Sequence, residues 1–90
     1  MSYQVRWKRT AKDQLASIWM NAKDRASVTA AAQQIDDWLQ TNPGTCGESR
    51  SGSRRILVVL PLAVVFKVHE QQEKVTVLSV RYTPPRMHQP

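Results

Sequence analysis

The sequence predicts an α+β domain in which a helical hairpin packs on one face of a four-stranded antiparallel sheet, made of an N-terminal strand and a later three-stranded meander. Three observations support this class. Three β-rich runs follow one another within residues 54–82, two helical patterns precede them, and a short alternating segment opens the chain. Because 90 residues build one modest core, residues 1–82 are expected to form a single domain. Residues 83–90, with three prolines in eight positions, are expected to form a proline-rich tail.

The three β-rich runs cover residues 56–60, 62–68 and 75–80. Pro61 separates the first two runs, and the polar segment 70–74 separates the last two. Short apolar runs divided by such turn residues are typical of an antiparallel meander, so two successive hairpins are expected.

The middle run of this meander is apolar on both sides. Val64, Phe66 and Val68 alternate with Ala63 and Val65, and residues at alternate positions of a strand lie on opposite faces. We expect helices to cover one face. The other face is then a candidate surface for a partner.

The chain opens with period-two alternation over residues 3–7, which predicts a half-buried strand. Thr10 is expected to cap a helix whose apolar positions continue to Ala22. Trp19 falls on the apolar side of this pattern, so we expect it in the core.

A second helical pattern follows a break at residues 21–24. It is expected to end near Thr41, because Pro43 disfavours a helical residue before it. Asp36 and Asp37 are expected on its solvent side. The core positions of this pattern are Val28, Ala32, Ile35 and Leu39.

The net charge of +6 indicates an acidic partner, either nucleic acid or an acidic protein, although a solvated basic surface without a ligand is the alternative. The single cysteine, Cys46, cannot form an internal disulfide, which fits a reducing cytoplasm. It lies in a polar, glycine-rich segment (residues 43–53) that predicts an exposed loop. No apolar run approaches a membrane span, so no membrane association is expected. The sequence shows no metal-ligand cluster and no cofactor motif, so neither a metal nor a cofactor is expected.

Three stretches together resemble the RelE/ParE family of toxins from bacterial type II toxin–antitoxin systems. They are the opening YQVRWKRTAKDQLASIW, the loop GESRSGSRR and the hairpin VVFKVHEQQEKVTVLSVR, and the diffuse match covers most of the chain. The resemblance implies a cytoplasmic toxin that inhibits growth and is neutralised by a cognate antitoxin. RelE-like members cleave mRNA on the ribosome, whereas ParE-like members poison DNA gyrase, so the target stays open. A homodimer and a toxin–antitoxin hetero-oligomer are both compatible with it.

The resemblance also directs attention to basic residues of the meander. RNA cleavage needs a group that activates the 2′-hydroxyl and cations that stabilise the developing charge. The candidate catalytic residues are His69, Lys67 and Arg81, although His69 could simply form a hydrogen bond beside a turn. The candidate nucleic-acid or target-binding residues are Arg50, Arg54, Arg55, Tyr82 and Arg86.

Two departures from the family pattern bear on the mechanism. Ribonuclease members usually carry an arginine where this chain has Ala63, and basic or aromatic residues where it has the segment 83–85. These departures favour ParE-like action by binding. RelE-like RNA cleavage is the first alternative, and an inactive relative or a small RNA-binding module is the second.

Overall fold

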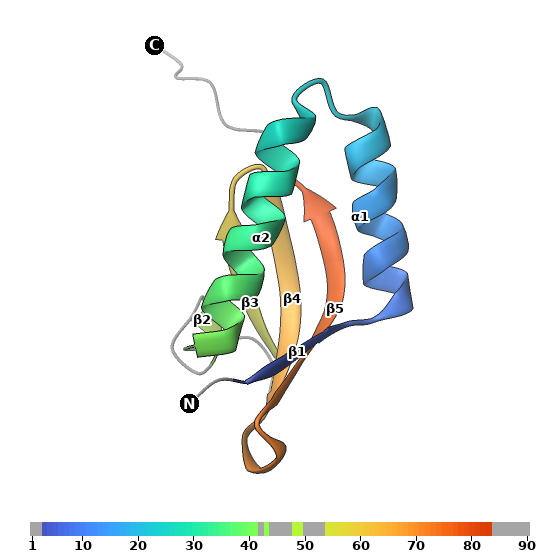
Figure 1. Ribbon diagram of the computed structural model, residues 1–90. Coiled ribbons are helices and arrows are strands. Elements are labelled where there is room, and N and C mark those ends of the chain that lie inside the picture. Colours follow the sequence, from blue (N-terminus) through green and yellow to red (C-terminus); the bar gives the residue numbers. More distant parts are fainter. Residues whose placement is uncertain (1–2, 42, 44–47, 50–53, 84–90) are drawn as a thin grey trace.

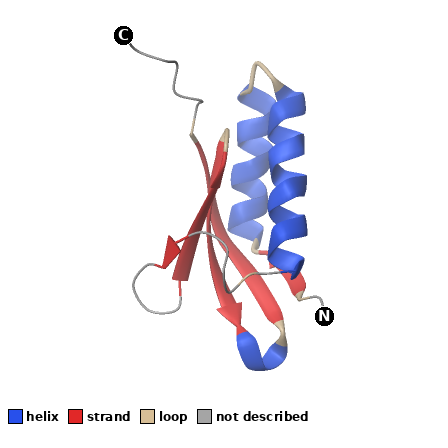
Figure 2. Ribbon diagram, turned by 90° about the vertical axis from the view of Figure 1, so that its left-hand side faces the viewer, coloured by secondary structure: helices blue, strands red, loops and turns tan. Residues whose placement is uncertain are grey.

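The computed structural model describes residues 3–41, 43, 48–49 and 54–83. Both helices lie on one face of the sheet, as the edge-on view shows (Figure 2), and the predicted α+β class is confirmed. The elements, in chain order, are β1 (Gln4–Trp7), α1 (Arg9–Asn21), α2 (Arg25–Thr41), β2 (Glu48–Ser49), β3 (Arg54–Val59), β4 (Leu62–His69), the 3₁₀ turn η1 (Glu70–Gln72) and β5 (Lys74–Tyr82) (Figure 1).

The sheet has the strand order β1-β5-β4-β3-β2. The two predicted hairpins, β3–β4 and β4–β5, are antiparallel. The sheet as a whole is mixed, however, because β1 pairs with β5 in parallel, which corrects the expectation of a purely antiparallel sheet. The short turn η1 joins β4 to β5 and makes them antiparallel, whereas β1 runs in the same direction as β5. The short β2 also adds a fifth strand, within a segment predicted as a loop.

The start of α1 differs from the prediction. Helix α1 begins at Arg9, and the residue before it, Lys8, makes no side-chain capping hydrogen bond, so Thr10 is not the cap. The Lys8 backbone N–H donates to the carbonyl oxygen of Val77 at 3.0 Å, while the Lys8 carbonyl accepts from the Lys12 N–H at 2.9 Å. The helix therefore begins directly where pairing of β1 with β5 stops.

Helix α2 has a carboxylate at its beginning. The Ser27 backbone N–H donates to Asp24 Oδ1 at 3.1 Å, and the Ser27 hydroxyl donates to Asp24 Oδ2 at 2.6 Å. These hydrogen bonds satisfy a free N–H of the first turn and lower the pKa of the Asp24 carboxyl. At its other end α2 stops at Thr41, as the proline at position 43 predicts.

The core fills the space between the helices and the central strands. Phe66 of β4 and Ile35 of α2 are fully buried in it. Three of the four predicted α2 core positions are buried, and Ala32 is half-buried beside them. The buried side chains of the cluster are Ala11, Val28, Ala31, Ile35, Leu39, Leu57, Leu62, Val64, Phe66, Val75, Val77 and Val80.

A β-bulge in the β4–β5 ladder keeps apolar residues on the core face. Val65 pairs with Ser79 and Phe66 pairs with Val77, so Leu78 has no residue opposite it. The extra residue changes the alternation of β5. The core-facing residues are Val75 and Val77 before the bulge and Val80 after it. Without this bulge, strict alternation would turn Val80 away from the helices.

Helix α1 is tied to this bulged strand by Gln14, whose side-chain oxygen accepts a hydrogen bond from the Val80 N–H at 2.7 Å. Replacing Gln14 with alanine removes this acceptor from a partly buried donor, and we expect a loss of about 1–3 kcal/mol in the free energy of unfolding. Urea unfolding followed by circular dichroism measures this change. Gln34→Ala, at an exposed position of α2, is the matched control and should change stability little. Equal stability of both variants would contradict a stabilising role for Gln14.

Trp19 is not in the core, contrary to the sequence-based expectation. Its side chain is 41% exposed, donates from Nε1 to Thr29 Oγ1 at 3.2 Å, and carries the Arg25 guanidinium 4.6 Å above its ring centre. Ala11, Leu15 and Ile18 make up the face of α1 that packs on the core. Trp19 lies next to this face, where it bridges α1 to α2.

Candidate functional site

The sheet face opposite the helices carries a row of basic side chains that crosses four adjacent strands. Arg6 of β1 pairs with Thr76 of β5, Thr76 pairs with Lys67 of β4, and Lys67 pairs with Arg54 of β3. Paired residues of neighbouring strands point to the same face. At a strand spacing of about 4.8 Å, this row extends roughly 14 Å.

A second row lies beside the first. Lys74 of β5 pairs with His69 of β4, and His69 lies two residues from Lys67 on the same face. The His69 ring Nε2 is 3.4 Å from Thr76 Oγ1, which links the two rows. We call the residues Arg6, Arg54, Lys67, His69 and Lys74 the basic face; all are exposed except the half-buried His69.

The structure brings three predicted site residues together and separates a fourth from them. Arg54, Lys67 and His69 are neighbours on the basic face. Arg81 points to the same side but pairs with Ala63, four residues from Lys67 along β4. That separation is about 13 Å along the strand. Arg81 is therefore not an immediate neighbour of Lys67 on this face.

Two further predicted residues lie on the other side of the sheet. Tyr82 pairs with the core residue Leu62 and lines a hollow with Ile18 and Ala22 at the end of α1. Arg55 pairs with Phe66 and is half-buried on the helix-bearing face. Neither shares a face with Lys67, so Tyr82 is not placed to stack on a base held there. The remaining two predicted residues, Arg50 and Arg86, lie outside the described residues.

The sequence-based site lacked two members of the basic face, Arg6 and Lys74. Both are distant from Arg54 in the chain, and Arg6 joins the face only because β1 pairs with β5. The alternation over residues 3–7 already placed Arg6 on the polar side of its strand. What the sequence did not reveal was the strand beside it.

The same sheet face becomes apolar toward its other end. Val58 of β3 is 51% exposed, and Ile56 and Val65 are half-buried beside it. The face therefore combines a basic half with a mainly apolar half, which also carries the exposed Arg81 opposite Ala63. The two-sided apolar pattern of the middle run predicted the apolar surface.

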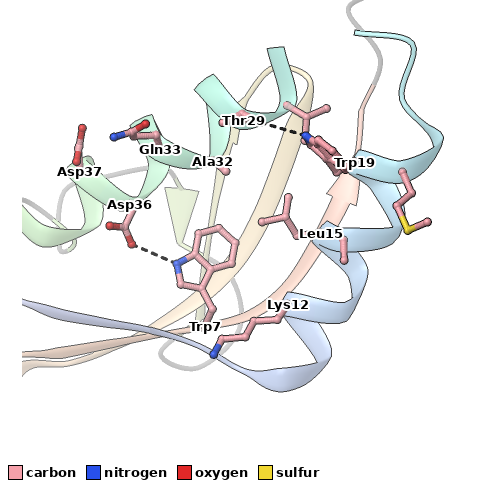
Figure 3. Close-up of a pocket in the computed structure, with 12 residues that line it drawn as sticks. Trp7, Lys12, Leu15, Trp19, Thr29, Ala32, Gln33, Asp36 and Asp37 are labelled. Atoms are coloured by element: carbon pink, nitrogen blue, oxygen red, sulfur yellow. Dashed lines mark hydrogen bonds between the residues drawn. The ribbon is translucent and has the colours of Figure 1, made fainter. Parts of the chain in front are cut away.

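A separate apolar groove of about 800 Å³ runs between α1 and α2 on the helical side (Figure 3). We call it the helix groove. Trp7, Leu15 and Trp19 form its apolar wall, and Met20 at its rim is 67% exposed. Such exposed apolar surface is typical of a place where another protein segment binds.

Asp36 lines the helix groove, and its position differs from the prediction. Asp36 Oδ1 accepts from Trp7 Nε1 at 3.2 Å, and Oδ2 accepts from Gln40 Nε2 at 2.8 Å. Asp36 is accordingly half-buried and connects β1 to α2, whereas Asp37 is exposed as expected. Sequence reasoning missed this contact because Trp7 and Asp36 lie 29 residues apart.

Within the described residues, no three His, Cys, Asp or Glu side chains come together in a way that could hold a metal ion. In the same part of the chain, neither helix has the length and apolar character needed to cross a bilayer.

No protein-family model matches the chain, and no curated protein sequence matches it. Several solved structures do match the chain. A chain of the toxin–antitoxin complex RelBE2 from Mycobacterium tuberculosis superposes with a TM-score of 0.74 at 16% identity, covering 91% of this chain and 92% of that chain. A chain of the chromosomal ParDE toxin–antitoxin system from P. aeruginosa gives 0.69 at 18% identity, with coverages of 90% and 96%. A chain of the archaeal RelE–RelB complex from Pyrococcus horikoshii gives 0.67 at 14% identity, with coverages of 92% and 97%.

These neighbours define a class of fold. The chain has the fold of the RelE/ParE toxins, and the resemblance noted in the sequence is confirmed at this level. Both RelE and ParE systems are among the matches, so the likeness does not distinguish between their targets.

Proposed function

We propose that this protein is the toxin of a type II toxin–antitoxin pair and that it inhibits growth by binding a nucleic-acid-processing target through the basic face. The observation that carries the proposal is the row of Arg6, Lys67 and Arg54 across four strands, on a sheet face that no described helix covers. Such a surface attracts polyanions and acidic proteins. The shared RelE/ParE fold supports the toxin role.

Binding without catalysis, as in ParE-like gyrase poisons, is our preferred mode of action. RNA cleavage requires several groups preorganised within reach of one phosphate. The separation of Arg81 from the other two catalytic candidates, Lys67 and His69, by about 13 Å along the sheet supports this preference. Ala63, at the position where ribonuclease members carry arginine, pairs with this same Arg81.

RelE-like cleavage is the second candidate, and one observation favours it. His69 lies between Lys67 and Lys74 and close to the Thr76 hydroxyl, so a base and two cations do lie near one another. A histidine in such a position could accept the 2′-hydroxyl proton while the lysines stabilise the phosphorane-like charge.

The antitoxin would bind as an amphipathic or acidic segment, partly on the sheet face and partly in the helix groove. The groove offers Trp7, Leu15 and Trp19 to apolar side chains of such a segment. This arrangement would neutralise the toxin by covering the basic face.

Pulse labelling of protein and DNA synthesis after induction of the chain without its antitoxin tests the proposed mode of action. We expect early loss of DNA synthesis with a DNA-damage response. Rapid loss of translation with cleaved mRNA would instead indicate the nuclease, and soluble, folded protein without growth inhibition would contradict the toxin role altogether.

The double variant His69→Ala/Arg81→Ala separates binding from cleavage. Neither side chain is part of the core, so the fold should persist. A toxin that acts by binding should lose growth inhibition only in part, because Arg6, Arg54, Lys67 and Lys74 of the basic face remain. Complete loss of growth inhibition in a folded double variant would favour the nuclease.

A further inference from the structure

A second group of basic residues gathers at the edge of the sheet, around the junction of β1 and α1. Arg6, Lys8, Arg9 and Lys12 line a hollow of about 740 Å³ there, together with Trp7, Asp13 and Thr76. We call this hollow the edge groove. None of its four cations was among the predicted site residues.

The positive charge of the edge groove is only partly balanced. Asp13 is the one acidic residue among those that line it. The first turn of α1 contains no acidic side chain, so Asp13, one turn further on, is the only lining carboxylate near Arg9 and the partial positive charge of the helix start. Four cations held close to one another without equal acidic partners repel each other, and a bound anion would relieve this repulsion.

The edge groove continues onto the basic face. A neighbouring hollow of about 490 Å³ is lined by Arg6, Lys12 and Thr76, which also line the edge groove, and by His69 and Lys74 of the basic face. Basic residues therefore follow one another from the first turn of α1, around β1, and across the sheet to Arg54. This path is longer than the roughly 14 Å of the four-strand row alone.

The lining of this path fits a phosphodiester backbone better than an acidic protein. Protein interfaces rely on apolar or aromatic anchors at their centre. The path instead presents mainly Lys, Arg, Thr and Gln side chains, which are the usual contacts of phosphate and sugar oxygens, and only Asp13, Val5 and His69 besides Trp7 depart from this set. Trp7 also lines it, but its indole N–H is bonded to Asp36 and its ring faces the helix groove (Figure 3).

We propose that the edge groove binds the phosphodiester backbone of a nucleic acid strand that continues onto the basic face. The protein would thus contact nucleic acid directly, in addition to any protein target. This inference goes beyond the proposed toxin role, which requires only that some target be bound and inhibited.

Fluorescence anisotropy with labelled single-stranded 20-nucleotide RNA, and with DNA of the same sequence, tests this proposal over a series of salt concentrations. The wild-type chain is expected to bind with an affinity that falls as salt rises, because binding releases counterions. The double variant Lys8→Gln/Lys12→Gln alters the edge groove and leaves the residues of the basic face intact. Loss of about two phosphate contacts should reduce the salt slope by about 1.4 and the affinity roughly 25-fold near 0.1 M salt.

Lys23→Glu is the matched control, since both variants lower the net charge from +6 to +4. Lys23 lies between α1 and α2, at the end of the helical hairpin away from β1 (Figure 1). The control should bind nearly as tightly as wild type, and circular dichroism verifies that both variants fold. A preference for RNA would indicate contacts to the 2′-hydroxyl, whereas equal binding of RNA and DNA would indicate recognition of the backbone alone; both support the proposal.

Two outcomes would overturn the proposal. One is no binding of either strand at 50 mM salt; the other is equal weakening by the double variant and the control, which would indicate a general effect of net charge. The assay does not measure growth inhibition, so failure here can be told apart from failure of the proposed toxin role.

Discussion

Replacing Phe66 with alanine is expected to destabilise the protein strongly. Phe66 lies in the middle of β4, is fully buried, and contributes the only phenylalanine of the chain to the core. Truncation of a buried phenylalanine costs about 3–5 kcal/mol, through lost burial and the cavity left behind. A domain of this size has a total stability of about 5–13 kcal/mol. The variant should therefore lose a large part of its stability.

Thermal unfolding followed by circular dichroism measures the effect of Phe66→Ala. We expect Tm to fall by roughly 15–30 °C. Phe66→Leu is the matched control, because it keeps most of the apolar volume and should cost much less. A similar Tm for Phe66→Ala and wild type would show that β4 is not the centre of the core.

Removal of two charges from the basic face is expected to abolish growth inhibition. Arg54 and Lys67 are paired neighbours on β3 and β4, and both side chains are exposed. The double variant Arg54→Gln/Lys67→Gln removes the middle and the end of the four-strand row while leaving the core untouched. Loss of adjacent cations from a surface that binds an acidic target weakens both the encounter and the bound complex.

The measurement is colony formation after induction of the variant without antitoxin, at protein levels equal to those of wild type. Lys23→Glu again serves as the control, since it also lowers the net charge from +6 to +4. The control should remain toxic while the double variant does not. Full toxicity of a folded Arg54→Gln/Lys67→Gln variant would show that the target is bound elsewhere.

The order and type of the main elements follow from the local sequence. Pro61 and the polar segment after His69 divide the apolar runs into two hairpins, because a proline or a polar turn interrupts a strand wherever it stands. Pro43 ends α2 near Thr41 for an equally local reason. The two-sided apolar character of β4 also depends on alternation within a single run of residues.

The candidate site could be predicted only in part, because its members come from distant parts of the chain. Lys67 and His69 lie two residues apart, so strand alternation alone places them on one face. Arg81 was grouped with them from its position at the end of β5, but pairing register sets it opposite Ala63 instead. Register depends on how neighbouring strands pack, which no single run of residues reveals.

The α+β class, the helical hairpin, the meander and the two apolar faces of its central strand follow from the sequence, because each depends on interactions between residues close in the chain. The parallel pairing of β1 with β5, which adds Arg6 to the basic face, and the hydrogen bond from Trp7 to Asp36 are visible only in the folded structure. The folded structure also places Trp19 at a groove and not in the core. These outcomes depend on contacts between segments far apart in the sequence, whose free energy comes from packing and pairing of whole elements and not from local preference.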